Sequence, residues 1–475
     1  MASQEFQDAI TSEVRRTSAQ ATFEFLDTTA SADTSLSSTN QETQVSRLAE
    51  INNARDYNTL KYITLEHNYF ALNGSSHLTP KTSETIPYLV GYLSNSISDS
   101  TGTFDASDVP TIHCGFTTDH SSIGLSFEFD KEYPTQIEII YYDKNGNVLK
   151  DDTLTNNDST FVYGGRIANY RAIDIKFLKT RNPYRRVRMY SLIFGIIKQW
   201  KDKDFLEFEL TRNTNIVDEE IPISELVIKV DNLSREFNIV NPSGVYEFLQ
   251  SKQLLKVKLG VYLNDSDVEY VNMGNYYLSD WQTDGITATL TADDKLSFIT
   301  KTFSVASNTT KTLKQWAIDI LTDSGYTDYD IDDSLANITV TTRFDAMDSI
   351  TLLKKIALAS NTLLYVDVND KVVFKKLPTT KEGEIEFANM YKEPKISLDP
   401  VTNQVSVEVW SYGVSEDART KVLVHNYEAD EEIFTKEYKD NPFITTQAIA
   451  TNVGNYILDL LSNRLEYNLD WRQNP

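Results

Sequence analysis

The sequence predicts a mainly β protein with an α+β part in its last third. Apolar residues recur at every second position through much of 62–197 and of 205–298, as in half-buried strands. The chain also has 26 Tyr and 22 Phe, residue types that favour sheets. Longer runs with apolar residues at helical spacing begin only at Leu313, which places the helices late in the chain.

Length and charge limit the classes of protein that this chain can belong to. A chain of 475 residues is expected to form about three domains. Its formal net charge of −24 argues against wrapping nucleic acid or coating an anionic membrane. A single cysteine, Cys114, excludes an intrachain disulfide. No apolar run reaches the ~18 residues of a membrane helix, and the N-terminus lacks the basic and apolar regions of a signal peptide.

The first 50 residues predict a helix, a strand and a linker. Ser3 is a suitable N-cap for a helix over Gln4–Ser12. Ala21–Leu26 alternates as a strand does. Asp27–Ser46 is rich in Ser, Thr, Asn and Gln, so we interpret it as a surface loop or linker.

Two β-rich blocks follow. In the first, Ile123–Phe129 alternates, and Asp143–Asn147 contains the Asn-Gly pair of a tight hairpin. Many short strands separated by turns predict a sandwich. In the second block, Val257–Leu263 alternates without intervening helices, which predicts a barrel or a second sandwich.

The third block mixes helices and strands. Its expected elements, in order, are a helix from Leu313 ended by Gly325, a helix over Asp348–Ser360, a hairpin of Leu363–Asp367 and Lys371–Lys375, a strand at Val405–Val409, and a helix over Thr445–Arg464. The chain then alternates from Leu465 and stops at Pro475. We expect either a truncated chain or a last strand that pairs with a neighbour.

A search for reactive chemistry predicts no catalytic, cofactor-binding or metal-binding residue. The five histidines lie at 67, 77, 113, 120 and 425, and no HExxH or CxxC occurs. Asp328–Asp333 starts like a calcium loop but has Asp333 where Gly is needed and Thr339 where Glu is needed. Phosphate-loop and nucleophile-elbow motifs are missing, and Cys114 is interpreted as a core residue.

A basic run stands out in this acidic chain: Arg181, Arg185, Arg186 and Arg188. One interpretation is a site for an anionic glycan or phosphate. The other is that Arg186 and Arg188 point outward from a strand whose inward residues are Val187 and Met189. We favour the second interpretation, because the alternation of inward and outward residues along a strand is enough to account for these arginines.

Four segments in order resemble a known module: KYITLEHNYFALNG, HSSIGLSF, YPTQIEIIYYDKNGNVL and YRRVRMYSLIFG, beginning at Lys61, His120, Tyr133 and Tyr184. Together they resemble the discoidin-like (galactose-binding-like) module of tail proteins from phages that infect Gram-positive bacteria. The resemblance covers about residues 52–197.

The flanking segments resemble the same phage tail-hub proteins. Ser3–Phe25 is similar to their opening, Asn272–Lys295 to a strand pair of the hub barrel, and Leu313–Leu377 to their helix–helix–hairpin domain. The resemblance implies a discoidin-like β-sandwich inserted into a tail-hub-type β-barrel and followed by an α+β hub domain. The implied divisions are 1–50 (helix, first hub strand, polar linker), 51–198 (sandwich), 199–305 (barrel) and 306–475 (α+β domain, incomplete at its end).

The resemblance also implies a function. Hub proteins of this kind join the tail tube to the tip of a phage tail or baseplate, usually as homo-trimers, beside other tail proteins. This chain would then lie in a virion or a phage-like particle, made in the bacterial cytoplasm. DNA would be only passing cargo, because an acidic lumen repels phosphate. We expect no enzymatic activity.

The sequence leaves two alternatives to the structural role. The sandwich is expected to bind cell-wall polysaccharide if the protein is a host-recognition adhesin, and the weak candidates for that contact are Tyr88 and Tyr92 in the loop-like stretch Thr79–Ser94. These tyrosines would otherwise pack within the sandwich or against a neighbouring subunit. The other alternative is a glycosidase or cell-wall hydrolase with an appended binding module, for which no motif is present.

Overall fold

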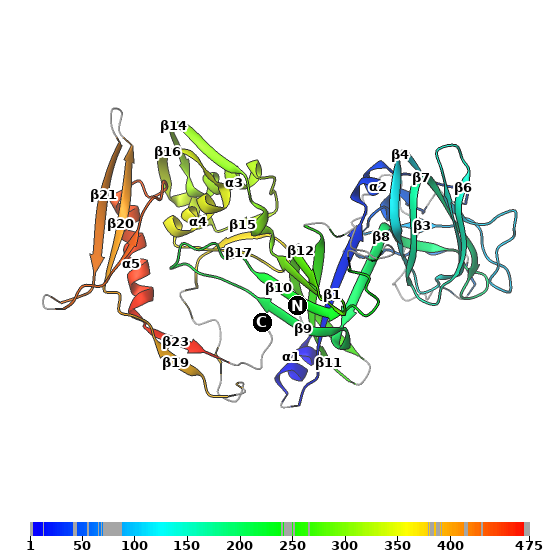
Figure 1. Cartoon of the computed structure of the whole chain (residues 1–475), viewed down its shortest axis with the longest axis horizontal. Coiled ribbons are helices and arrows are strands. Elements are labelled where there is room, and N and C mark those ends of the chain that lie inside the picture. Colours follow the sequence, from blue (N-terminus) through cyan, green and yellow to red (C-terminus); the bar gives the residue numbers. More distant parts are fainter. Residues whose placement is uncertain are drawn as a thin grey trace. The chain divides into compact units, whose positions relative to one another are not determined.

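The computed structural model confirms a mainly β protein with an α+β part (Figure 1). It describes residues 3–469 except 13, 41–44, 55–56, 65, 68, 70–87, 239–240, 242–248, 250–251, 265–266, 379, 381–383, 386–389, 391, 413–416 and 429–430. The chain forms two compact units. Unit 1 comprises 1–21, 200–233 and 254–475, and unit 2 comprises 22–199 and 234–253.

Unit 1 begins with the predicted helix and strand. Helix α1 spans Gln4–Thr11, and the Ser3 hydroxyl accepts a hydrogen bond from the Phe6 amide at 3.0 Å. Phe6 and Ile10 pack against Val261. Strand β1 spans Thr17–Leu26, so it starts in unit 1 and ends in unit 2.

The sheet of unit 1 runs in the order β1-β11-β12-β13-β10-β9. Its later strands are β9 Phe205–Thr211, β10 Glu225–Asp231, β11 Leu254–Tyr262, β12 Val268–Thr283 and β13 Thr287–Asp293. Leu226 and Ile228 face Ala292 and Leu290 across the β10–β13 ladder, and all four are fully buried. Ile286 precedes β13 and is 57% exposed.

The α+β part follows in unit 1. Its elements are β14 Thr302–Thr312, α3 Leu313–Asp323, β15 Tyr329–Ile331, β16 Thr339–Asp348, α4 Ser349–Ser360, β17 Leu363–Val366 and β18 Val372–Lys375. Trp316 of α3 and Leu353 of α4 lie in one core with the buried residues of β16 and β18. The predicted helix ends and hairpin are confirmed: the backbone of Gly325 is left-handed just past α3, and the β17–β18 pair closes through Asp370.

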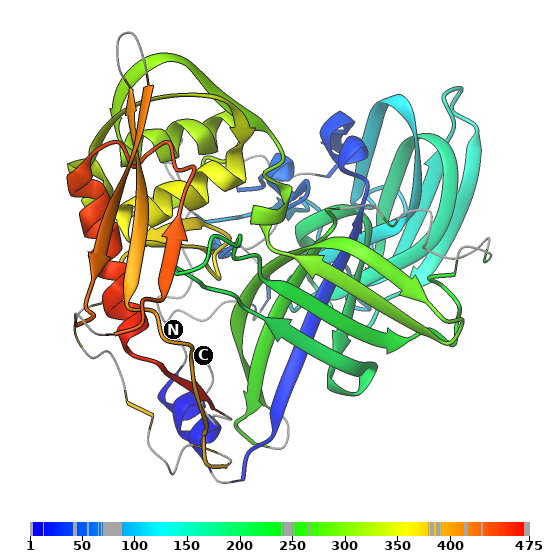
Figure 2. The same cartoon turned by 60° about the vertical axis from the view of Figure 1, so that its left-hand side comes forward.

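The last elements of unit 1 are β19 Lys395–Leu398, β20 Gln404–Tyr412, β21 Asp417–His425, β22 Thr435–Tyr438, α5 Gln447–Ser462 and β23 Leu465–Asn468. Strands β21, β20 and β22 form one sheet, and α5 packs along β20 and β21 (red and orange in Figure 2). Strands β19 and β23 form a separate two-stranded sheet.

Unit 2 is an antiparallel sandwich. Its elements are α2 Thr28–Asp33, β2 Ser35–Ser38, β3 Tyr92–Leu93, β4 Thr111–Phe129, β5 Pro134–Tyr142, β6 Val148–Thr155, β7 Thr160–Thr180 and β8 Arg188–Lys201. The long β4 and β7 pair on both sides of an irregular stretch between Gly115 and Gly124. Because the two halves of these strands pair with different neighbours, they enclose a core that contains Phe127, Ile139 and Phe177.

The prediction of a surface loop or linker over Asp27–Ser46 is wrong, because α2 and β2 lie within this segment. The Asp27 carboxylate caps α2 by accepting from the Ala30 amide at 2.9 Å. Strand β2 pairs with β4, and Leu36 packs on the core. A mainly polar segment forms these elements because capping and edge pairing need few apolar residues.

Candidate functional site

The strand ends bring several loops together at one end of the sandwich. The register places Phe129 opposite Met189 and Pro134 opposite Thr180, so residues 130–133 lie beside 181–187. The described residues of 57–69 and of 94–104 bond to the same region. We call these four segments the loop end. In the middle of β8, Gly195 approaches β1.

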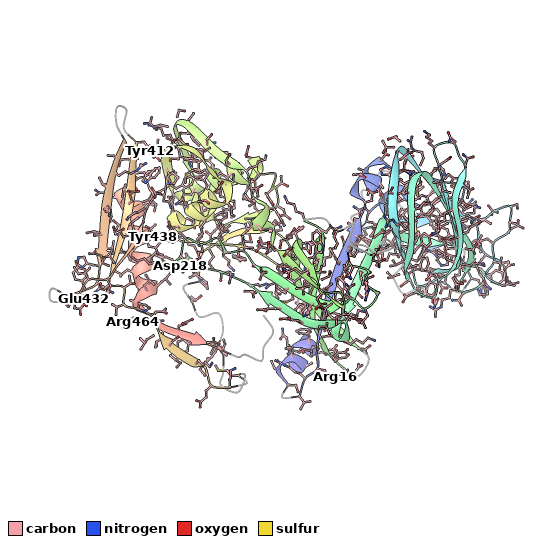
Figure 3. The ribbon with its side chains drawn as sticks, in the orientation of Figure 1. Arg16, Asp218, Tyr412, Glu432, Tyr438 and Arg464 are labelled. Atoms are coloured by element: carbon pink, nitrogen blue, oxygen red, sulfur yellow. The ribbon has the colours of Figure 1, made fainter. Side chains whose placement is uncertain are left out.

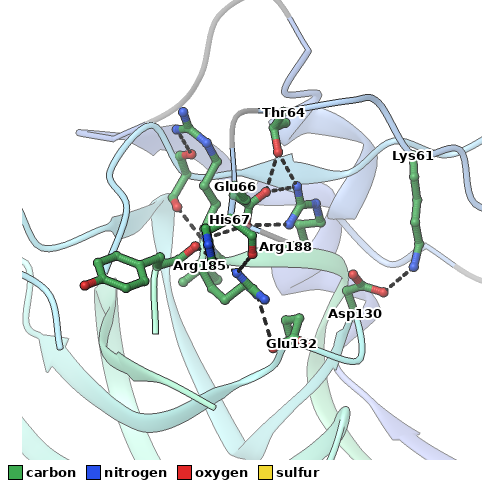
Figure 4. Close-up of polar contacts among 12 residues, drawn as sticks. Lys61, Thr64, Glu66, His67, Asp130, Glu132, Arg185 and Arg188 are labelled. Atoms are coloured by element: carbon green, nitrogen blue, oxygen red, sulfur yellow. Dashed lines mark hydrogen bonds and ion pairs between the residues drawn. The ribbon is translucent and has the colours of Figure 1, made fainter. Parts of the chain in front are cut away.

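A buried ion pair fixes the loop end (Figure 4). The Arg188 guanidinium at the start of β8 donates to both carboxylate oxygens of Glu66, one of them at 3.1 Å. The side chains are 7% and 0% exposed. Thr64 and the backbone amide of Arg186 also donate to Glu66. Burial alone would raise the pKa of Glu66, but the bonds and charge of Arg188 outweigh burial and lower it.

The other arginines of the basic run hold backbone carbonyls. Arg185 donates to the His67 carbonyl at 2.7 Å and to the Tyr184 carbonyl at 3.1 Å, and it lies 3.6 Å from Glu132. Arg186 donates to the carbonyls of Ser94, at 3.0 Å, and Asn95. These guanidinium groups join loops that are far apart in sequence.

Aromatic rings line the same loops. The Tyr69 ring lies 4.4 Å from the guanidinium carbon of Arg188 and 5.5 Å from that of Arg185. The rings of His67 and Tyr184 meet edge to face at 6.3 Å. His67 is exposed and Tyr184 is 45% exposed, so this pair offers aromatic surface to solvent. Arg185 fixes the pair by holding the carbonyls of both residues.

Tyr184 has a strained backbone. Its φ of +57° lies in the left-handed region, which is rare for a bulky residue. Its amide donates to the Asp99 carbonyl at 3.2 Å, and Arg185 holds its carbonyl. Such strain persists only where surrounding contacts fix it, and it is concentrated at functional sites.

The structure corrects the prediction for Tyr92 and leaves that for Tyr88 open. Tyr92 lies in β3 and is fully buried, and its hydroxyl donates to the Asn40 carbonyl at 3.3 Å. It packs within the sandwich and cannot stack on a sugar. Tyr88 is 46% exposed. Residues 79–87 of the same stretch lie outside the described residues.

The outward interpretation of the basic run is also corrected. Arg188 is 6% exposed because the Glu66 segment covers it. Alternation predicted that the Arg188 side chain points to solvent because it shows only which face of the strand a side chain is on. It does not show whether a segment distant in sequence covers that face. Sequence reasoning missed Glu66, His67 and Tyr184. The cluster Tyr184-Arg185-Arg186 immediately before a strand was the one signal for this site.

The described histidines outside the loop end, and Cys114, pack or bond within the fold. His113 bonds Asp174 at 2.6 Å, the buried His120 bonds Asp33 at 2.9 Å, and His425 stacks on Tyr427 at 4.3 Å. His77 lies outside the described residues. Cys114 is buried in β4, and burial raises the pKa of its thiol. Within the described ranges, no group of three His, Cys, Asp or Glu side chains fits a metal ion.

The acidic run at 328–333 does not form a calcium loop. Residues 329–331 are strand β15, and the Asp332 carboxylate caps the following turn by accepting from the Ser334 amide at 2.8 Å. The Asp328 carboxylate lies 3.4 Å from Lys371, and the Asp333 carboxylate lies 2.5 Å from Lys314.

Of the helices that the structure describes, none has the length and apolar character needed to cross a bilayer.

Comparison with known proteins gives similarities among solved structures. No family model and no curated protein matches the chain. The 43 kDa tail protein of prophage MuSo2 from Shewanella oneidensis has 14% identity, over 57% of this chain and 79% of that one, with a TM-score of 0.35. The tail protein from Neisseria meningitidis MC58 has 10% identity, over 54% and 72%, with a TM-score of 0.34. The family 32 carbohydrate-binding module from C. perfringens NanJ, in complex with galactose, has 10% identity, over 38% of this chain and 99% of that one, with a TM-score of 0.21.

Proposed function

We propose that this protein is a non-catalytic structural component of a phage tail tip or baseplate hub, and that its sandwich binds a bacterial cell-surface glycan. The chain passes from unit 1 to unit 2 and back, at residues 21–22 and 199–200, so the sandwich is an insertion within the chain of unit 1. The sequence resemblance to tail-hub proteins supports the structural half of the proposal. In this role the chain assembles with other tail proteins, as a homo-trimer, in a virion or phage-like particle, and DNA only passes by it.

One observation carries the glycan-binding half: the exposed His67–Tyr184 pair stands on loops that are already fixed. The apolar C–H face of a sugar ring packs on an aromatic ring, and such contact gains most when the rings need not be ordered on binding. Arg185 and the Glu66–Arg188 pair provide that order. Their guanidinium groups are engaged by the protein, so we favour a neutral glycan over an anionic one.

Binding of purified cell-wall polysaccharide to the whole chain tests this half. We expect Tyr184→Ala and His67→Ala each to weaken binding about tenfold, the loss of one stacking contact. Leu149→Ala is the control, because Leu149 is 42% exposed at the hairpin on the opposite end of the sandwich. Tyr88→Ala tests the competing tyrosine. Unchanged binding in both loop-end variants would refute the proposed site.

Labelling of intact particles tests the structural half. Antibodies raised against the purified chain should mark the tip of the tail in electron micrographs of phage or phage-like particles. Marking of the host cell surface alone would favour a free adhesin, which has the same loop end but no place in a particle. Release of reducing sugar from cell walls would refute a non-catalytic role.

A further inference from the structure

Strands β19 and β23 form a ribbon that stands apart from the other sheets. The register pairs Ile396 with Tyr467 and Leu398 with Leu465. Figure 1 shows β23 directly after α5 with β19 alongside it, and Figure 3 labels Arg464 at this point. Arg464 Nε donates to the Asp399 carbonyl at 2.8 Å, which closes this end of the ribbon.

One face of the ribbon is apolar and exposed. Directly paired residues of a sheet share a face, so the four apolar side chains lie together. Ile396, Leu398, Leu465 and Tyr467 are 58%, 66%, 45% and 52% exposed. The opposite face is polar, with Ser397 donating to Glu466 at 2.8 Å. A two-stranded ribbon is marginally stable by itself, and a continuous apolar patch marks an interaction surface.

The ribbon also has an open edge at β19. The Asp399 amide donates to the Arg464 carbonyl at 2.8 Å, so residue 399 points its backbone at β23. Because this direction alternates along a strand, Ile396 and Leu398 point their backbone groups away from β23. Among the described strands, β23 is the one neighbour of β19. Ile396 and Leu398 therefore offer donors and acceptors for another strand.

The sequence of this edge is complementary to itself. In an antiparallel pair centred on Ser397, Lys395 stands opposite Asp399 of the second copy, and Ile396 stands opposite Leu398 of the second copy. Both ends of the pair thus join opposite charges, and the apolar residues share a face. Strand β23 has only Glu466 as a charged residue and offers no such match.

Two prolines select this register. Pro394 and Pro400 flank the edge and lack the amide donor that a ladder needs. Shifting the centre to Ile396 places Pro394 in the ladder opposite Leu398 of the second copy. The pairing centred on Ser397 uses only Ile396 and Leu398, and each of these pairs exchanges two backbone hydrogen bonds.

We propose that the β19 edges of two copies of this chain pair antiparallel about Ser397 and form a four-stranded sheet β23-β19-β19-β23. The sheet gathers the apolar faces of both ribbons into one surface. The occupant of the edge is a second copy because the charges and the prolines fit β19 itself. The inference concerns assembly only. A two-fold pair cannot close a ring of three, so in a trimeric protein the pairing joins copies of two different trimers, and it holds or fails independently of glycan binding and of the tail-tip role.

A single introduced cysteine tests the pairing. In the proposed pair, Ser397 of one chain lies opposite Ser397 of the second copy, at a position where the two residues do not exchange backbone hydrogen bonds. Their Cα atoms are then about 4.5 Å apart, within the range of a disulfide. The native chain has only Cys114, which is buried. We expect the full-length Ser397→Cys protein to form, in air, a disulfide-linked species of twice the chain mass on a non-reducing gel. A trimer formed through other surfaces gives no such link.

Glu466→Cys is the matched control. It removes the same hydrogen bond on the same face, but in the proposed sheet the two positions stand three strand spacings apart, about 14 Å. That distance exceeds what a disulfide spans. No linkage of Ser397→Cys, or equal linkage of both variants, would overturn the pairing.

Charge reversal on the Ser397→Cys background tests the register. Lys395→Asp places Asp opposite Asp at both ends and should slow linkage about tenfold. Adding Asp399→Lys restores opposite charges and should restore the rate. A double variant that stays as slow as the single variant would refute the register, because both variants then fail for reasons other than charge.

Discussion

Gly195 of β8 lies directly against the backbone of Phe25 in β1: a Cβ atom on Gly195 would stand 2.0 Å from the Phe25 carbonyl oxygen. Gly195 also has a φ of +141°, which L side chains rarely adopt. We therefore expect Gly195→Ala to destabilise the sandwich by about 2–4 kcal/mol. Urea unfolding measures the loss. Gly164→Ala is the control, because a Cβ at Gly164 meets nothing within 4 Å, and it should be neutral or slightly stabilising. Equal effects would contradict this account.

The Glu66–Arg188 pair predicts an asymmetric effect of charge removal. Glu66→Gln leaves the buried Arg188 guanidinium without its countercharge and should cost about 3–5 kcal/mol in unfolding free energy. Asp119→Asn removes the partner of Arg171, at side-chain exposures of 41% and 32%, and should cost less than about 1 kcal/mol. Chemical denaturation of both variants compares the pairs, and a Glu66→Gln loss as small as the control would argue against a buried pair.

The same pair predicts a dependence on pH. The folded state lowers the pKa of Glu66 below its ordinary 4.5. When the pH falls below 4.5, the unfolded chain takes up this proton first, so the contribution of Glu66 is complete above pH 4.5 and is lost as the pH falls through the lower folded value. Wild type should therefore lose its advantage over Glu66→Gln progressively as the pH falls below 4.5. A gap between the two proteins that stays constant in thermal melts as the pH falls below 4.5 would contradict the assignment.

The buried carboxylate of Asp294 predicts a pH dependence of stability in the opposite direction to that of Glu66. Its side chain accepts from the amides of Ser224 and Leu296 at 2.8 and 3.0 Å, and burial raises its pKa from 3.8 to about 6. Stability therefore falls as the pH rises from about 4 to 6, because only the unfolded chain releases the proton early. Asp294→Asn removes the titrating group but places its NH2 against one of the two backbone donors. We therefore expect the difference in unfolding free energy between pH 3.5 and pH 7 to shrink in this variant, whatever the cost of the lost hydrogen bond. Asp280→Asn, at an exposed position, should leave that difference unchanged.

Local chemistry made part of the fold predictable from sequence. The Asp143–Asn147 turn is confirmed because its signal is contained within five residues: the Asp143 carboxylate accepts from the amides of Asn145 and Asn147, each at 2.8 Å. The Ser3 cap and the Gly325 stop are of the same kind. Mainly β character followed from alternation within single strands such as β10 and β13, in which every second residue is buried.

The loop end was not predictable in that way. Glu66 and Arg188 are separated by 122 positions, and the sequence around either residue does not indicate that the other is its partner. Tyr92 and Tyr184 are both tyrosines in loop-like sequence, yet one is fully buried and the other 45% exposed. That difference depends on which segment covers each ring. Polar composition concealed α2 and β2 because they are held by a cap and by pairing to β4.

Strand β1 belongs to unit 1 at its beginning and to unit 2 at its end, where Asp27 still bonds Phe194 of β8 through a 2.8 Å backbone contact. Strand β8 likewise continues from unit 2 into unit 1. A pulling force on the sandwich would therefore pass through the backbone of two strands and not through loops.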